Sequence, residues 1–158
     1  MGEGYRDYRR KFLDIINSEF KDKKKVIKLY LNRQHKISNN QYREIMSRAK
    51  IIINFSKSLS YDQLKYRVFE AIHFGALLFE SENDQIKEHF CEFEDYIPFS
   101  SIDDLVIKIR FYLNDLKLSK KIAESSQIKF NHLVEDKKYK KKLIEIISNV
   151  ESRSEEHT

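Results

Sequence analysis

The sequence contains little glycine, proline or cysteine, and it has no tryptophan. Its 158 residues include three glycines, one proline and one cysteine. The single cysteine, Cys91, excludes an internal disulfide and a zinc site built from several cysteines, and it is typical of a reducing compartment. Gly2 and Gly4 lie at the extreme N-terminus, so Gly75 is the one glycine in the body of the chain.

Long apolar runs are also missing. The N-terminal stretch MGEGYRDYRRKF lacks the apolar core of a signal peptide, and no run approaches the roughly 20 residues that cross a membrane. We therefore expect a cytoplasmic protein. An excess of one charge is absent too, because 25 acidic residues are interspersed with 30 basic ones. Without a basic stripe interleaved with aromatic residues, we expect no nucleic-acid partner.

The remaining composition suits one folded domain. Hydrophobic residues make up 41% of the chain and charged residues 35%, which is typical of a well-packed domain rather than a disordered chain. No internal repeat or linker divides the sequence, and its length is short for two cores. We expect one domain over residues 1–150. The end of the chain, RSEEHT, resembles a translated sequencing adapter, so residues 151–158 are predicted to be a non-native or disordered tail.

Two kinds of segment alternate along the chain. Runs of β-branched and other apolar residues predict strands at 26–31, 50–55, 76–79 and 96–99. Apolar residues at helical spacing predict helices at 8–20, 40–49, 63–74, 83–90, 103–113, 119–130 and 135–150. The strand KIIINF at 50–55 shows little alternation, which predicts burial on both faces. The pattern predicts an α/β fold, a Rossmann-like three-layer α/β/α arrangement around a parallel sheet.

Such sheets bind ligands at the carboxyl ends of their strands. The strand ending at Phe55 leads into a polar loop, and the helix that starts near Gln63 offers free N–H groups that favour an anion. The strand ending at Phe79 is expected to deliver residues 80–83 to the same edge. Gly75 is predicted to end the helix in a left-handed conformation, so that the chain turns sharply into this strand.

Two motifs at a fixed spacing carry a resemblance to a known family. They are KIIINFS at 50–56 and RVFEAIHFGALL at 67–78, followed by Asn83, Tyr96 and the tripeptide at 104–106, DLV. Together they resemble group 1 glycosyltransferases, and more narrowly the spore-maturation-like subgroup with a GT-B fold. The resemblance runs from about residue 5 to residue 150 and concerns the C-terminal, nucleotide-sugar-binding half of those enzymes. It implies that the N-terminal acceptor-binding domain is missing and that the chain alone is inactive.

The resemblance also implies roles for individual residues. Glu70 matches the glutamate that accepts hydrogen bonds from the donor ribose, a role that suits a carboxylate. Asp62 matches an acidic residue that contacts the donor sugar, and it is the candidate catalytic residue. The expected contacts to the diphosphate come from Gln63, Lys65 and Arg67, with Arg6 and Arg9 as weaker candidates and Asn83 returning to the same ligand.

The resemblance implies no metal or other cofactor, because no paired-aspartate motif is present and the nucleotide-diphosphate sugar is a donor substrate. Simpler interpretations stay open. Arg67 and Glu70 suit an exposed helical pair, and Asp62 suits a helix N-cap. The lysine run at 137–142 suits either a solvated helix face or peripheral contact with an anionic membrane. The alternative function is a non-catalytic Rossmann-like module for nucleotide binding or protein interaction.

Overall fold

The computed structural model describes residues 5–21, 38–56, 66–136 and 140–141. Its helices are α1 (Tyr5–Glu19), α2 (Asn39–Arg48), α3 (Tyr66–His73), α4 (Asp84–Lys87), α5 (Ile102–Asn114) and α6 (Leu116–Glu135). Its strands are β1 (Ile51–Asn54), β2 (Leu77–Ser81) and β3 (Ile97–Phe99). The predicted alternation of strands and helices is confirmed over these ranges. The strand predicted at 26–31, most of the helix at 135–150 and the tail at 151–158 lie outside the described residues.

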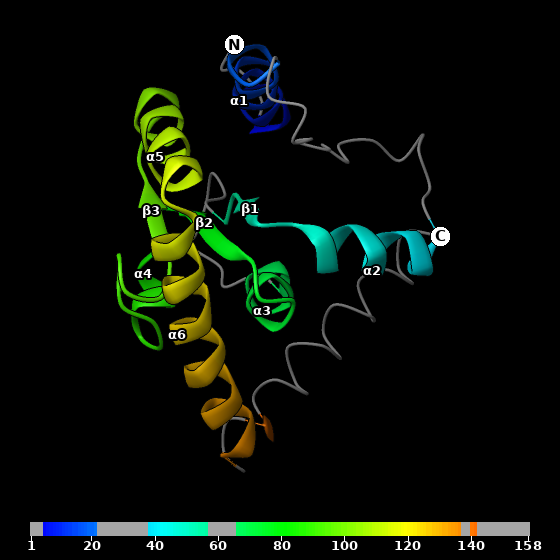
Figure 1. The fold of residues 1–158 in the computed structure, drawn as a ribbon, viewed down its shortest axis with the longest axis vertical. Helices are drawn as coiled ribbons and strands as arrows, with labels where there is room; N and C mark the ends of the chain where they lie inside the picture. Colours follow the sequence, from blue (N-terminus) through cyan, green and yellow to red (C-terminus); the bar gives the residue numbers. More distant parts are fainter. Residues whose placement is uncertain (1–4, 22–37, 57–65, 137–139, 142–158) are drawn as a thin grey trace.

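The three strands form one parallel sheet in the order β1-β2-β3. Ile53 pairs with Phe79, and Phe79 pairs with Ile97 on its other side, so β2 lies in the middle of the described sheet (Figure 1). Because each strand is parallel to the next, all carboxyl ends meet at one edge of the sheet. The predicted parallel arrangement is confirmed.

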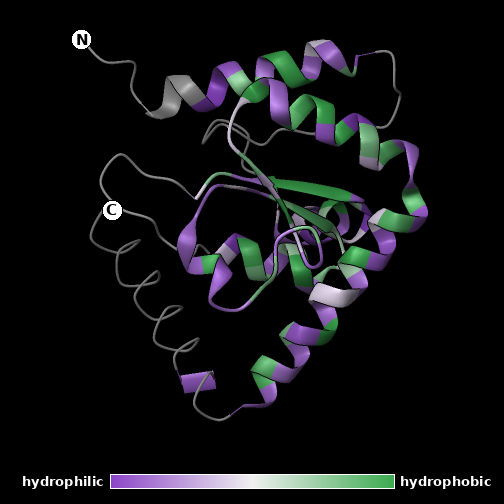
Figure 2. Ribbon diagram, turned by 90° about the vertical axis from the view of Figure 1, so that its left-hand side faces the viewer, coloured by the Kyte–Doolittle hydropathy of each residue, from purple (hydrophilic) through white to green (hydrophobic). Residues whose placement is uncertain are grey.

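Helices cover both faces of the sheet. Successive side chains of β2 point to opposite faces, and each face packs against different helices. Leu77 and Phe79 join a buried cluster with α1 and α5, whereas Leu78 joins a second cluster with α3 and α4. The long helix α6 contributes to both clusters. Figure 2 shows the hydrophobic strands between helices that each carry hydrophobic and hydrophilic residues. The result is the predicted three-layer α/β/α fold.

Strand β1 contacts both clusters, as its sequence predicts, but its isoleucines are only half-buried. Ile51 and Ile53 pack against the cluster with α1, and Ile52 packs against the cluster with α3. Asn54, at the carboxyl end of the strand, is fully buried. Burial therefore increases along β1 toward the edge where the candidate site lies.

Gly75 closes α3 as predicted, with a φ of +74°. The Gly75 N–H donates to the Ile72 carbonyl and the Ala76 N–H donates to the Ala71 carbonyl, at 3.0 and 3.1 Å. These two bonds form a Schellman motif, which satisfies the last carbonyl groups of the helix. The turn leads directly into β2 and fixes the spacing between α3 and the strand.

Several element boundaries differ from the prediction, and α1 begins at Tyr5 rather than at residue 8. Strand β2 continues to Ser81 instead of ending at Phe79, because Glu80 is buried and hydrogen-bonded at the sheet edge. Helix α4 ends at Lys87 rather than near Phe90. Helix α6 spans Leu116–Glu135, longer than the predicted 119–130, since Asp115 caps its start by accepting a bond from the Leu118 N–H.

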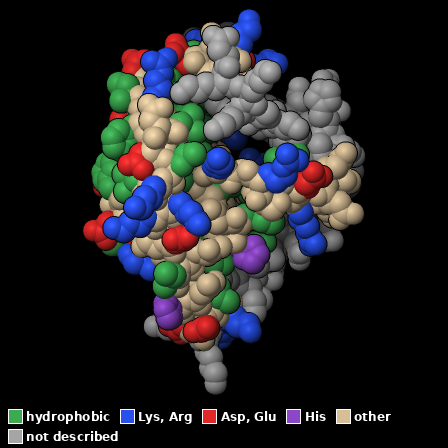
Figure 3. All heavy atoms as spheres, viewed as in Figure 1, with side chains coloured by type: hydrophobic (Ala, Val, Ile, Leu, Met, Phe, Trp, Pro, Cys, Tyr) green, Lys and Arg blue, Asp and Glu red, His purple; other side chains and the backbone are tan. Residues whose placement is uncertain are grey.

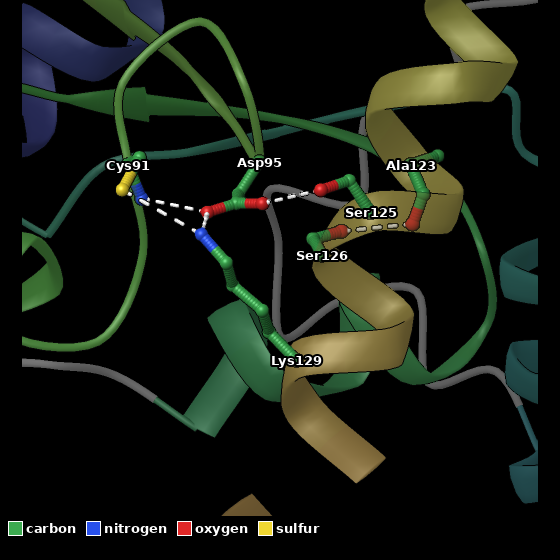
Figure 4. Close-up of polar contacts among 6 residues, drawn as sticks. All are labelled: Cys91, Asp95, Ala123, Ser125, Ser126 and Lys129. Atoms are coloured by element: carbon green, nitrogen blue, oxygen red, sulfur yellow. Dashed lines mark hydrogen bonds and ion pairs between the residues drawn. The ribbon is translucent and has the colours of Figure 1, made fainter. Parts of the chain in front are cut away.

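A buried carboxylate joins the turn before β3 to α6. Asp95 is fully buried and accepts 2.7 Å hydrogen bonds from the Cys91 N–H and the Ser125 hydroxyl, together with a bond from the Lys129 ammonium (Figure 4). Burial raises the pKa of Asp95, but these donors outweigh it and hold the pKa below its usual value. The cluster lies at the amino end of β3, and we interpret it as structural.

Candidate functional site

Polar side chains meet at the carboxyl ends of β1 and β2. Asn54 Nδ2 donates to Glu80 Oε2 at 2.8 Å and to the Ser56 hydroxyl at 2.9 Å. The Ser56 N–H in turn donates to Glu80 Oε1 at 3.1 Å and to the Ser81 hydroxyl at 3.0 Å. Glu80 and Ser56 are completely buried. This network joins the first residues after β1 to the end of β2. It lies at the carboxyl edge of the sheet, where ligands bind in such folds.

Arg9 brings a positive charge from α1 to the same edge. Its guanidinium carbon lies 5.5 Å from the centroid of the Phe55 ring, and Phe55 directly follows β1. The ring is fixed in turn by edge-on contacts with Phe12 and Phe99, at centroid distances of 5.5 and 5.4 Å. The cation over the ring is therefore held on a rigid aromatic base.

Glu70 lies on α3 and is held by a residue from another helix. The hydroxyl of Tyr42, on α2, donates a 2.8 Å hydrogen bond to Glu70 Oε2. Both side chains are half-buried. Arg67, one turn earlier on α3, is exposed.

The charges around Tyr42 show how closely these groups are placed. Burial raises the pKa of Tyr42 to about 12, and the hydrogen bond and negative charge of Glu70 contribute to this shift. The positive charge of Arg67 opposes it. The Glu70 carboxylate and the Arg67 guanidinium therefore both act on the neutral Tyr42 hydroxyl, and together these groups can bind both a hydroxyl group and an anion.

Asn83 is placed by the structure as a helix cap. Its side-chain oxygen accepts a 2.9 Å hydrogen bond from the Gln85 N–H at the start of α4. The residue is buried, with an exposed fraction of 2%. A helix was predicted to begin at residue 83, and Asn83 caps that helix. Its predicted contact with the ligand stays a prediction.

Several predicted site residues lie outside the described part of the chain. They are Asp62, Gln63 and Lys65, which precede the described start of α3 at Tyr66. Arg6 belongs to α1, but its side chain is not described. In the lysine run, Lys140 and Lys141 are exposed and the other lysines fall outside the described ranges.

Two contacts at this site, those of Tyr42 with Glu70 and of Glu80 with Asn54, were not predicted from the sequence. Tyr42 lies 28 positions before Glu70, and no local pattern links the two. Glu80 was expected at this edge, after a strand ending at Phe79, but its burial and its hydrogen bond with Asn54 were not expected. The parallel register pairs Asn54 with Glu80, so an amide and a carboxylate at the ends of adjacent strands had to meet.

Charges of both signs are mixed on one face of the described residues. On the face drawn in Figure 3, Lys and Arg side chains alternate with Asp and Glu. Within the described residues, no group of three or more His, Cys, Asp or Glu side chains is placed to hold a metal ion. No helix in the described ranges is both long and apolar enough to cross a membrane.

Comparison with known proteins gives one match. The model of a family described as glycosyl transferase-like matches residues 7–146, which is most of the chain. The match begins within α1 and includes every later helix and strand named above. No curated protein and no solved structure matches the chain. The fold, the position of the polar edge and this match agree, and the chain belongs to the glycosyl transferase-like family.

Proposed function

We propose that the chain is the donor-binding domain of a GT-B glycosyltransferase, the C-terminal half of a group 1 enzyme of the spore-maturation-like subgroup. It binds a nucleotide-activated sugar for transfer to a glycan, lipid or protein acceptor. The acceptor side of the cleft belongs to an N-terminal domain outside this sequence. A cytoplasmic location suits the single cysteine of the chain.

The observation that carries this proposal is the environment of Glu70. Its carboxylate accepts a hydrogen bond from the Tyr42 hydroxyl, and the charge of Arg67, one turn earlier on α3, acts on the same tyrosine. A fixed carboxylate accepts hydrogen bonds from a ribose diol, while an exposed guanidinium beside it binds a phosphate. The segment that contains Glu70 lies within the family match.

The remaining candidates supply the charge that the reaction needs. When the bond between the anomeric carbon and the diphosphate oxygen breaks, negative charge develops on the departing nucleoside diphosphate. Arg67 and Arg9, with Lys65, Arg6 and the N–H groups near Gln63, stabilise that charge electrostatically. Asp62 contacts the sugar, and Asn83, which follows β2, contacts the same ligand. The proposal requires no catalytic metal.

The alternative is a non-catalytic module that keeps the nucleotide site or serves as an interaction domain. Glu80 and Asn54 belong to a buried hydrogen-bond network that holds the carboxyl ends of β1 and β2 together. A rigid sheet edge of this kind suits both the enzyme and the non-catalytic module. The two proposals differ in turnover, because only the enzyme transfers the sugar when an acceptor-binding domain is supplied.

A thermal-shift screen tests the proposed function directly. The purified chain is heated with UDP, GDP and their common sugar derivatives, with ATP and inorganic diphosphate as controls. A ligand present at about 100 times its Kd raises the free energy of unfolding by about 2.7 kcal/mol, which gives a clear shift in Tm. Stabilisation by one nucleotide-sugar, followed by its turnover with an added N-terminal domain, supports the enzyme. Failure of every nucleotide to stabilise the chain overturns the proposal.

A further inference from the structure

Tyr42 reaches the candidate site from a helix that the family motifs do not include. Helix α2 begins with a capping box, in which the Ser38 hydroxyl accepts from the Gln41 N–H and the Gln41 side chain accepts from the Ser38 N–H. Met46, on the same helix, is buried. Tyr42 follows directly after the cap, so its backbone is fixed where the hydroxyl meets Glu70.

The bond between Tyr42 and Glu70 leaves the carboxylate able to bind more. The hydroxyl engages Glu70 Oε2 at 2.8 Å. A carboxylate has about four lone-pair sites, so one donor leaves acceptor capacity for two further hydroxyl groups. At neutral pH the tyrosine is a neutral donor, as an ordinary tyrosine is, and its pKa is raised further to about 12. The hydroxyl thus orients the carboxylate without competing for its charge.

We propose that Tyr42 is a positioning residue that turns the Glu70 carboxylate toward the ribose diol and so sets a preference for ribonucleotides over dideoxyribonucleotides. This inference rests on the proposed function. Without the hydroxyl, the Glu70 side chain samples other rotamers, and part of the binding free energy is lost in fixing it again. In this arrangement Tyr42 acts on the ligand through Glu70.

Calorimetric titration of matched variants tests this inference. The proteins are wild type, Tyr42→Phe, Glu70→Gln and the double variant, with Tyr112→Phe as a control. Tyr112 is a buried tyrosine of α5 in the core, away from the α2 and α3 junction. Each protein is titrated with UDP or GDP, whichever wild type binds more tightly, and with the 2′,3′-dideoxy form of the same nucleotide.

We expect Tyr42→Phe to weaken binding of the ribonucleotide about three- to tenfold, the effect of one hydrogen bond, and to leave the dideoxynucleotide within about twofold. The double variant should bind no more weakly than Glu70→Gln, because the tyrosine acts through the carboxylate. Tyr112→Phe should match wild type for both ligands.

Three results overturn the inference. If Tyr42→Phe loses affinity equally for the ribonucleotide and the dideoxynucleotide, the tyrosine has a structural role only. Unchanged ribonucleotide affinity in Tyr42→Phe, together with weaker binding in Glu70→Gln, removes the role of Tyr42 and keeps the proposed function. If wild type binds no nucleotide, the proposed function fails and this inference fails with it.

Discussion

Asn54 and Glu80 are register partners on adjacent parallel strands, and the Asn54 amide donates a 2.8 Å hydrogen bond to the Glu80 carboxylate. The other carboxylate oxygen accepts from the Ser56 N–H at 3.1 Å. Both donors are N–H groups, so each of the two side-chain atoms that face them at position 80 must be a hydrogen-bond acceptor. A glutamine at position 80 supplies only one acceptor oxygen and places an NH₂ group against a donor.

Glu80→Gln should therefore destabilise the fold by about 1 to 3 kcal/mol, the cost of leaving a buried donor without its partner. Urea unfolding followed by circular dichroism measures this change. Glu82→Gln, two residues later and exposed, is the matched control and should stay within about 0.5 kcal/mol of wild type. If the two variants unfold at the same urea concentration as wild type, the buried network is not important for stability.

The buried carboxylate of Asp95 predicts a pH dependence of stability. Its folded-state pKa is lowered, because hydrogen bonds from Lys129, the Cys91 N–H and Ser125 outweigh the effect of burial. A lowered pKa contributes stability that is present above the unfolded value of about 3.9 and is lost as pH falls through the folded value. The free energy of unfolding should thus decrease in acid.

Asp95→Asn should be less stable than wild type by about 1 to 3 kcal/mol at neutral pH, since the Lys129 ammonium loses its partner. This difference should shrink as the pH falls below about 4, because the unfolded chain takes up a proton there, and it should be lost as the pH falls through the lower folded-state pKa of Asp95. Unfolding curves from pH 3 to pH 7 measure it, with the exposed Asp84→Asn as a control. A difference that stays constant with pH contradicts the assignment.

Gly75 gives a prediction about backbone conformation. A Cβ at this position would lie 3.4 Å from Gln127 Nε2, which is an ordinary contact, so a side chain fits. The φ of +74° is the obstacle, since the left-handed region costs an L-residue about 1 to 2 kcal/mol. Gly75→Ala should lower the free energy of unfolding by that amount, and Gly75→Asn by less. If Gly75→Ala and wild type unfold at the same urea concentration, the positive φ at this position does not require glycine.

Local chemistry explains which features could be predicted from the sequence. The apolar run before Asn54 and the glycine after α3 each specify their structure through neighbouring residues, so the strands and the turn were predicted correctly. Glu80 could not be placed in the same way. A glutamate after an apolar strand is normally exposed, and its burial depends on donors supplied by β1.

The same limit applies to Tyr42 at the candidate site. Its role depends on how α2 packs near α3, and that packing follows from tertiary contacts rather than from any pattern within α2. The resemblance to glycosyltransferases pointed to Glu70 and Arg67 because they lie in one short motif. It carried no information about a partner 28 positions away.

Glu70→Gln tests the proposed ribose contact. Glutamine keeps the size of the side chain and an oxygen that accepts a hydrogen bond from the Tyr42 hydroxyl. The free energy of unfolding should therefore change by no more than about 0.5 kcal/mol. It removes the charge that strengthens both hydrogen bonds to a diol. The affinity for a nucleoside diphosphate should therefore fall by about 1.5 to 3 kcal/mol in a calorimetric titration with UDP and GDP.

Exposed residues outside the site provide the controls for Glu70→Gln. His73→Ala, at the far end of α3, and Lys140→Ala should keep the affinity within about threefold of wild type. Inorganic diphosphate separates the two halves of the ligand, because it lacks the ribose and should bind wild type and Glu70→Gln equally. If Glu70→Gln binds its best nucleotide as tightly as wild type, Glu70 does not contact the ribose, and its bond with Tyr42 serves only to join α2 to α3.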